Sequence, residues 1–232
     1  MASSLTNLLS KFCAPLYRKV KRIRVKGKNN ILSFQGELVK SKTTISGSDN
    51  SIHLGAGGML ARSTIRIDGN NNSIHISEGC RLLNATIIVN GEGCRVSIGQ
   101  NTMASGPGSL YIICMGNGNY VNIGEDCMFA DVVEIWASDT HPILDKENKL
   151  LNPSKPVSIG NHVWLGRYVK VLKGVTIGDG AVVGMDSLVT RDIQSGTLNA
   201  GSPTRCLKEH IQWEKGFITP YELNTPAPLN QA

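Results

Sequence analysis

One histidine, His141, is the best candidate in this sequence for a catalytic residue. His141 opens a polar stretch, follows Asp139 by two residues and precedes Pro142, which stiffens the backbone. A neutral imidazole near pH 7 is the usual general base for removing a proton from a hydroxyl group. No Gly-x-Ser-x-Gly elbow and no Ser–His or Cys–His pairing accompanies it, so the residues do not indicate a covalent intermediate. The alternative interpretation is a solvated or capping loop histidine.

Asp139 is a candidate for orienting the His141 ring through its second nitrogen. Residues two apart in an extended segment point the same way, so the two side chains are expected on one side. Asp131 and Glu134 are rivals for this role from the preceding stretch.

Two further histidines raise the question of a metal. His53 and His75 occupy equivalent positions in two similar segments, so we expect them to stack on one outer face. Ser97 and Asn122 take the next equivalent positions, so a third metal ligand is missing. We therefore expect no metal site.

The element that must position these residues is a six-residue repeat from Ile159 to Gln194. An aliphatic residue opens each of six hexads, and a small or β-branched residue fills every fifth position. Such hexads are typical of a parallel β-helix, in which three hexads form one coil and the first position points inward. The fold class predicted is therefore all-β.

A longer repeat precedes the hexads. Ile31 is expected to be its first member, because it lies 21 residues before the next one. The later members are spaced 22, 22 and 25 residues apart: Ile52, Ile74, Val96 and Val121. Three cysteines fall in inward positions of this register and are expected to pack in the core: Cys80, Cys114 and Cys127. The six cysteines include no C-x-x-C pair, which favours free thiols in a reducing compartment.

We expect three regions. Residues 1–26 form a basic arm with a short amphipathic helix, which either caps the open end of the β-helix or lies on an anionic membrane surface. Residues 27–203 form the β-helix, interrupted by a protruding loop at about 140–156 that carries three prolines. Residues 204–232 form a short C-terminal helix, over about 204–215, and a tail.

Charge is unevenly distributed along the chain. The net charge is +6, and eight Lys or Arg residues precede the first acidic residue, Glu37. A uniformly basic nucleic-acid binder would not look like this, so we expect no nucleic-acid partner. The sequence shows neither a signal peptide nor 18 consecutive apolar residues. We expect a cytoplasmic protein, with residues 1–28 making peripheral contact with the inner face of the membrane or with polysaccharide-assembly proteins.

Several segments together resemble the hexapeptide-repeat acyltransferases, and most closely the sugar, capsule and lipopolysaccharide O-acetyltransferases. Beyond the hexads, the resemblance rests on residues 138–142 (SDTHP), 159–166 (IGNHVWLG), 189–193 (VTRDI) and 200–205 (AGSPTR). It implies a left-handed parallel β-helix, a homotrimer with active sites between subunits, and acetyl-CoA as co-substrate. It also implies that His141 is the catalytic base. His141 would deprotonate the acceptor hydroxyl, which then attacks the acetyl-CoA thioester directly.

The resemblance assigns the coenzyme to the last coils and to the exit from them. The positions that match are Trp164, Gly166, Gly184, Arg191, Pro203 and Arg205, and Lys173 joins them on charge alone. Arginine suits the polyphosphate of CoA because it binds phosphate in a bidentate manner. Each of these cations could equally be a solvated surface residue. The exit motif, usually Gly-x-Pro-Ala-Lys, reads Gly-Ser-Pro-Thr-Arg here. His162 lies at a variable position and is interpreted as structural.

Three functions compete. The first is O-acetylation of a sugar in a bacterial-type surface polysaccharide or its precursor. The second is N-acetylation of an amino-sugar nucleotide, which is disfavoured because no nucleotide-binding β-α-β region precedes the coils. The third is a carbonic-anhydrase-like metalloenzyme, which needs three convergent histidines, whereas only His141 and His162 lie in the right region.

Overall fold

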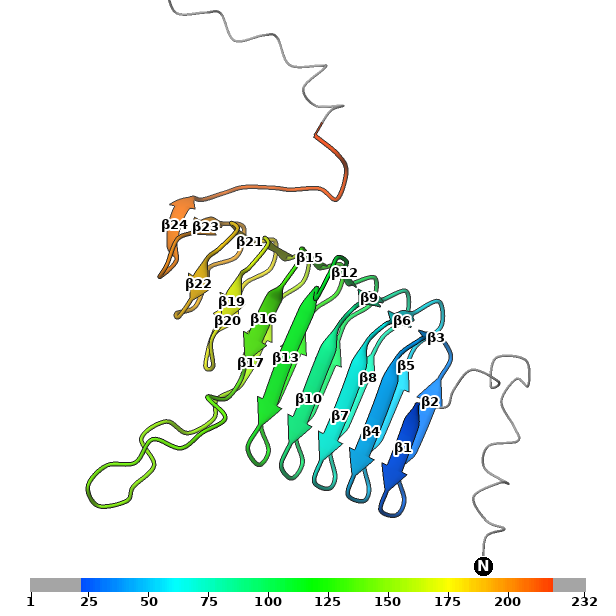
Figure 1. The fold of residues 1–232 in the computed structure, drawn as a ribbon. Helices are drawn as coiled ribbons and strands as arrows, with labels where there is room; N and C mark the ends of the chain where they lie inside the picture. The colour runs from blue at the N-terminus through cyan, green and yellow to red at the C-terminus, as the bar shows by residue number, and fades with distance from the viewer. Residues whose placement is uncertain (1–21, 219–232) are drawn as a thin grey trace, which may run out of the picture.

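The computed structural model describes residues 22–218, which form 24 short strands and no helix. Three strands make one coil, and equivalent strands of successive coils pair in parallel to build three sheets. Figure 1 shows the coils stacked along one axis, from β1 to β22. The left-handed parallel β-helix implied by the hexads and the resemblance is confirmed.

The first sheet has eight strands: β1 (Ile23–Lys26), β4 (Lys42–Ser46), β7 (Thr64–Asp68), β10 (Thr86–Asn90), β13 (Leu110–Met115), β16 (Val133–Trp136), β19 (Lys170–Val171) and β22 (Leu188–Val189). The second sheet has seven: β2 (Ile31–Phe34), β5 (Ser51–Leu54), β8 (Ser73–Ile76), β11 (Arg95–Ile98), β14 (Tyr120–Ile123), β17 (Val157–Ile159) and β20 (Thr176–Ile177). The third sheet has nine: β3 (Glu37–Val39), β6 (Met59–Ala61), β9 (Arg81–Leu83), β12 (Met103–Ala104), β15 (Met128–Phe129), β18 (Trp164–Leu165), β21 (Val182–Val183), β23 (Leu198–Ala200) and β24 (Arg205–Lys208).

The chain turns three times in each coil. We call the turn from the first to the second sheet the first corner, the turn from the second to the third sheet the second corner, and the turn back to the first sheet the third corner. Because equivalent turns stack, residues far apart in the sequence line up along one corner.

The core is the narrow interior of this prism. All six residues that open the hexads are buried, as predicted: Ile159, Leu165, Val171, Ile177, Val183 and Val189. The cysteine prediction is also confirmed, since Cys80, Cys114 and Cys127 are fully buried and Cys114 pairs with Val89 in the predicted column. Burying aliphatic side chains contributes about 1.5–3 kcal/mol per residue, so the stack of inward residues holds the coils together.

Three details of the prediction need correction. Leu32, not Ile31, pairs with Ile52, so the register of the first coil is shifted by one residue and Ile31 points outward, 62% exposed. The β-helix begins at Ile23, four residues before the expected boundary, because β1 pairs with β4. The predicted N-terminal helix lies outside the described residues.

The predicted C-terminal helix is wrong. Residues 205–208 form β24, which pairs antiparallel with β23, and residues 209–218 contain no helix. The edge of the third sheet offers unpaired backbone groups, and pairing with them satisfies this segment better than isolated helical turns would.

Candidate active site

The repeat is interrupted once, at the first corner. Residues 137–156 leave the end of β16 and return to β17, and Figure 1 shows this loop projecting away from the coils. Its two arms form an antiparallel bridge between Leu144 and Leu150, and the Asp145 carboxylate accepts the backbone N–H groups of Glu147 and Lys149 at its tip. The predicted protruding loop is therefore confirmed.

His141 lies at the base of this loop, with its backbone fixed and its ring exposed. Its N–H donates to the carbonyl of Asp139 (2.7 Å), and its own carbonyl accepts from Nδ2 of Asn152 (3.0 Å). Within residues 22–218 the imidazole makes no hydrogen bond, so both ring nitrogens are available to a substrate. Thr140, directly before it, has φ of 65°. A β-branched residue in this region is an outlier, and such strain clusters at functional sites.

The Asp139 carboxylate is directed elsewhere than at the His141 ring. It pairs with the Lys173 ammonium and accepts from Nδ2 of Asn152 (2.9 Å). The hydrogen bond from Lys173, supported by that from Asn152, lowers the Asp139 pKa below its usual value. The Asn152 amide thus links the Asp139 carboxylate to the His141 carbonyl.

The rival acids are occupied at other places. The Glu134 carboxylate accepts from Nε1 of Trp136 (2.8 Å), and Asp131 lies 3.7 Å from the Arg167 guanidinium at the third corner. Neither carboxylate contacts the loop base.

An open cleft of about 380 Å³ lies beside His141. One wall is the loop base, and the other consists of turns from earlier coils at the first corner. The residues that line this cleft include Asn90, Met115, Asn117, Asp139, His141 and Asn152. A mixed polar and apolar cleft with one free imidazole at its edge suits a hydroxyl-bearing acceptor.

The residues expected at the coenzyme site divide between two places. Lys173 and Arg191 both lie at the first corner, each two residues after a paired valine of β19 and β22. Lys173 is already engaged, since its ammonium also donates to the carbonyl of Asn152 (3.0 Å), while Arg191 is exposed. Both cations therefore lie on the same corner as the loop that carries His141.

The other five belong to the third sheet and the third corner: Trp164, Gly166, Gly184, Pro203 and Arg205. Trp164 in β18 is 38% exposed, and Arg205 is exposed in β24. One chain therefore does not bring this group and His141 to the same corner.

Close approach of the coils explains one of these glycines without any ligand. A Cβ at Gly166 would lie 2.7 Å from the backbone nitrogen of Met185 in the next coil. A side chain would push the coils apart, so only glycine fits.

Sequence reasoning missed Asn152, the residue that ties the loop base together. Its side chain also accepts the N–H of Ile143 (2.6 Å). Nothing in the local sequence marks it, because its partners are 9 to 13 residues away in a hairpin whose shape the repeat does not determine.

The expected histidine stack is present on the second sheet. His53 pairs with His75, with ring centroids 4.7 Å apart. Across residues 22–218, no group of three or more His, Cys, Asp or Glu residues is placed to hold a metal.

Comparison with known proteins shows which family shares this architecture. Residues 156–191 match the family model described as bacterial transferase hexapeptide (six repeats). The chain is 38% identical over 96 residues to a polysialic acid O-acetyltransferase of Escherichia coli O1:K1 / APEC, covering 41% of this chain and 31% of that protein. It is 34% identical over 128 residues to the galactoside O-acetyltransferase of Escherichia coli K12, covering 54% of this chain and 59% of the relative. Both alignments therefore span less than two thirds of the curated relatives.

Two solved structures match over more of their length. The polySia-specific acetyltransferase NeuO superposes with a TM-score of 0.72 and 30% identity, covering 84% of this chain and 82% of that one. The polysialic acid O-acetyltransferase OatWY superposes with a TM-score of 0.74 and 30% identity, covering 84% and 92%. With the hexads, the coil topology and these two relatives in agreement, the chain belongs to the hexapeptide-repeat acetyltransferase family.

Proposed function

We propose that this protein is an acetyl-CoA-dependent O-acetyltransferase whose acceptor is a sugar hydroxyl in a bacterial-type surface polysaccharide or its precursor. The observation that carries the proposal is the His141 imidazole, exposed at the edge of a cleft with its backbone fixed by Asn152. The two relatives that cover most of the chain are both named for acetyl transfer to polysialic acid.

The proposed reaction is a direct attack in a ternary complex. A ring nitrogen of His141 takes the proton of the acceptor hydroxyl as its oxygen bonds to the acetyl carbon. The C–S bond then breaks, and the CoA thiolate leaves with the proton that His141 returns. Holding both substrates together supplies most of the rate gain, and proton transfer adds about 10²–10⁴-fold. Asp139, Asn152 and Lys173 act as positioning residues for the loop base.

The candidate site residues of one chain are divided between two corners, which supports an oligomer in which neighbouring subunits bring the two groups together. We propose a homotrimer in which Trp164, Gly166, Gly184, Pro203 and Arg205 of one subunit face the His141 loop of a neighbour. Arg191 and Arg205 then offer cations to the CoA phosphates. Because Lys173 is paired with Asp139, its role in this proposal is structural, and it changes from a coenzyme ligand to an anchor of the loop.

The basic N-terminal arm supplies a separate proposal, that the protein associates peripherally with the inner face of the membrane. The described residues contain no helix long and apolar enough to span a bilayer. Deleting residues 1–21 removes none of the strands that the structure describes, because the first of these begins at Ile23. Loss of binding to anionic vesicles on this deletion supports the idea, whereas unchanged binding contradicts it.

The catalytic proposal is tested with His141→Ala. Acetyl transfer from acetyl-CoA is measured against a panel of acceptors that includes polysialic acid, neutral polysaccharides and an amino-sugar nucleotide. We expect transfer to a hydroxyl acceptor to fall about 10²–10⁴-fold while CoA binding and oligomeric state stay unchanged. Near wild-type turnover would remove His141 from the mechanism. Transfer to the amino-sugar nucleotide alone would replace O-acetylation by N-acetylation. Glu147→Ala, at the tip of the same loop, is the matched control.

A further inference from the structure

A column of turns at the second corner contains an unexplained departure from glycine. Seven successive turns place a residue at positive φ: Gly57, Gly79, Asn101, Asp126, His162, Gly180 and Gly196. The three other than glycine have φ between 51° and 58°. Asparagine and aspartate tolerate this region better than other residues, but at His162 it costs about 1–2 kcal/mol relative to glycine, and such a residue persists when its surroundings require it.

All three are contacted by the end of the described chain. Residues 211–215, which we call the strap, run along this corner, and alternate strap residues face it. The N–H of Ile211 donates to the carbonyl of Gly196 (2.9 Å), Trp213 lies at His162, and Nζ of Lys215 donates to the carbonyl of Asn101 (3.2 Å). The strap therefore crosses several coils along one line.

The strap is held most firmly at His162. The His162 ring stacks on the Trp213 indole with centroids 4.1 Å apart and planes 10° apart. The indole N–H donates to the carbonyl of His162 (2.9 Å), so ring and backbone are both engaged. The His162 nitrogens face the Asp126 carboxylate (2.8 Å) and the carbonyl of Trp213 (3.0 Å). Both partners are acceptors, so the ring satisfies them together only with a proton on each nitrogen.

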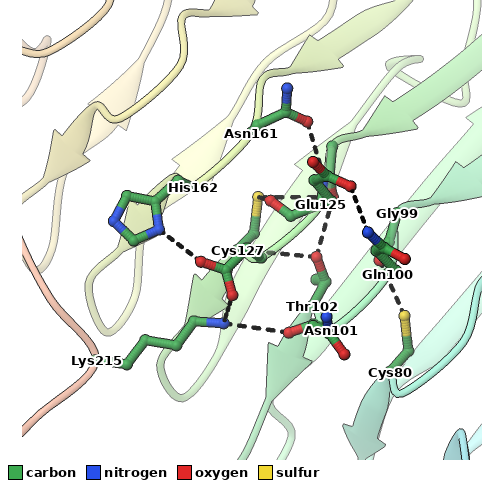
Figure 2. Close-up of polar contacts among 12 residues, drawn as sticks. Cys80, Gly99, Gln100, Asn101, Thr102, Glu125, Cys127, Asn161, His162 and Lys215 are labelled. Atoms are coloured by element: carbon green, nitrogen blue, oxygen red, sulfur yellow. Dashed lines mark hydrogen bonds and ion pairs between the residues drawn. The ribbon is translucent and has the colours of Figure 1, made fainter.

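Asp126 links His162 on the corner to Lys215 at the end of the strap. Figure 2 shows the His162 ring and the Nζ of Lys215 each joined by a dashed line to the same carboxylate, and the hydrogen bonds identify it as that of Asp126. The Lys215 ammonium lies 2.6 Å from the carboxylate, and with His162 it lowers the Asp126 pKa below its usual value. Trp213, which stacks on His162 and packs against Trp164, is only 9% exposed.

The strap also touches the candidate coenzyme wall. The Trp213 and Trp164 rings are tilted by 43° with centroids 5.8 Å apart, a favourable aromatic geometry. Trp164 projects from the third sheet and is otherwise exposed, so the buried Trp213 is a fixed surface against which its indole rests. His162 lies two residues before Trp164 in the chain, and its ring stacks on the Trp213 indole that packs against Trp164.

We propose that the strap positions Trp164 for acetyl-CoA, with Trp213 and His162 as positioning residues. The inference rests on the proposed function, because it assigns the Trp164 surface to the coenzyme. If the strap only stabilised the fold, it would need no aromatic contact with Trp164, an exposed residue of the third sheet. Loss of the strap contact frees the Trp164 ring to rotate, so coenzyme binding then has to order it.

The test measures CoA and acetyl-CoA binding by calorimetry, and steady-state kinetics, for Trp213→Ala. We expect the Kd and the KM for acetyl-CoA to rise about three- to tenfold, the effect of losing one aromatic contact, with kcat and the acceptor KM unchanged. His162→Asn should behave alike, since asparagine tolerates the left-handed turn. Trp213→Phe keeps the stack and should restore most of the affinity. Phe217→Ala, at an 88% exposed ring two residues beyond the strap, is the control.

The outcomes separate the two proposals. If wild-type protein binds CoA and both Trp213→Ala and His162→Asn bind it equally well, the strap has no positioning role. A fall in kcat that lowers kcat/KM equally for both substrates, together with a lower melting temperature, also overturns the inference, because it marks a purely structural contact. If Trp213→Ala does not fold, His162→Asn and Trp213→Phe decide the result. Absence of CoA binding by the wild type removes the proposed function itself.

Discussion

Asn152→Ala is the sharpest test of the loop base. The amide side chain makes three hydrogen bonds, to the Asp139 carboxylate, the His141 carbonyl and the Ile143 N–H. The backbone bond from Lys173 to the Asn152 carbonyl survives the substitution. At about 0.5 kcal/mol each, the low end for a half-buried residue, the three bonds total roughly 1.5 kcal/mol, or about tenfold in the population of the ordered loop.

Two measurements follow the loop independently. We expect hydrogen exchange of the Ile143 amide to accelerate about tenfold, because its acceptor is removed. We expect kcat to fall by up to about tenfold, since His141 keeps its ring but loses its fixed carbonyl. The melting temperature should stay close to that of the wild type, because residues 139–156 contribute no side chain to the buried core. Lys149→Ala, in the same hairpin, is the control.

Faster exchange of the Ile143 amide with an unchanged kcat would refute a link between loop order and catalysis. That result would show that order at the loop base does not matter for turnover. A loss as large as that of His141→Ala would contradict the positioning role of Asn152, because Asn152 would then act on the reacting atoms directly.

Further predictions concern the coils and the Asp139 anchor. Gly166→Ala should destabilise the protein by about 1–3 kcal/mol, because the new methyl group meets the Met185 nitrogen; thermal melting should show no such loss for Gly216→Ala, which has open space around it. The lowered Asp139 pKa means that the anchor is fully present above the usual aspartate value of about 3.9 and is lost as pH falls through the lower folded value. Exchange protection of Ile143 should therefore be constant from about pH 4 to 7 and weaken below that range. Asp139→Asn should show no such acid transition, and its persistence would assign the transition to another group. Thiol reagents should modify Cys206 of native protein in a Cys13→Ser background, while Cys80, Cys94, Cys114 and Cys127 stay protected, and early labelling of a buried thiol would contradict the packing.

Much of the fold was predictable because its code is local. The inward-pointing residue can be identified within each hexad. Because similar hexads stack on one another, few alternative registers are possible. The burial of Val171 and Val189 and the column through Cys114 followed directly. The one-residue error at Ile31 arose where the repeat begins and no earlier coil sets the register.

The candidate site was predictable only in part. His141 was visible as the histidine at the break in the repeat, and the structure places it at a cleft. The partner of Asp139 was not visible, because Lys173 lies 34 residues later and reaches it through the stacking of coils. The C-terminal segment reads locally as a helix, but the open edge of the third sheet captures it as β24.

The sequence by itself determined the period, the inward residues, the position of the loop and the histidine at its base, because each depends on residues within one coil. Only the tertiary structure decided which side chains meet across coils. Asn152 joins Asp139 to His141, and Trp213 covers His162 from 51 residues away. Such contacts depend on where a loop or strap lies against stacked corners, and no short-range pattern records that placement.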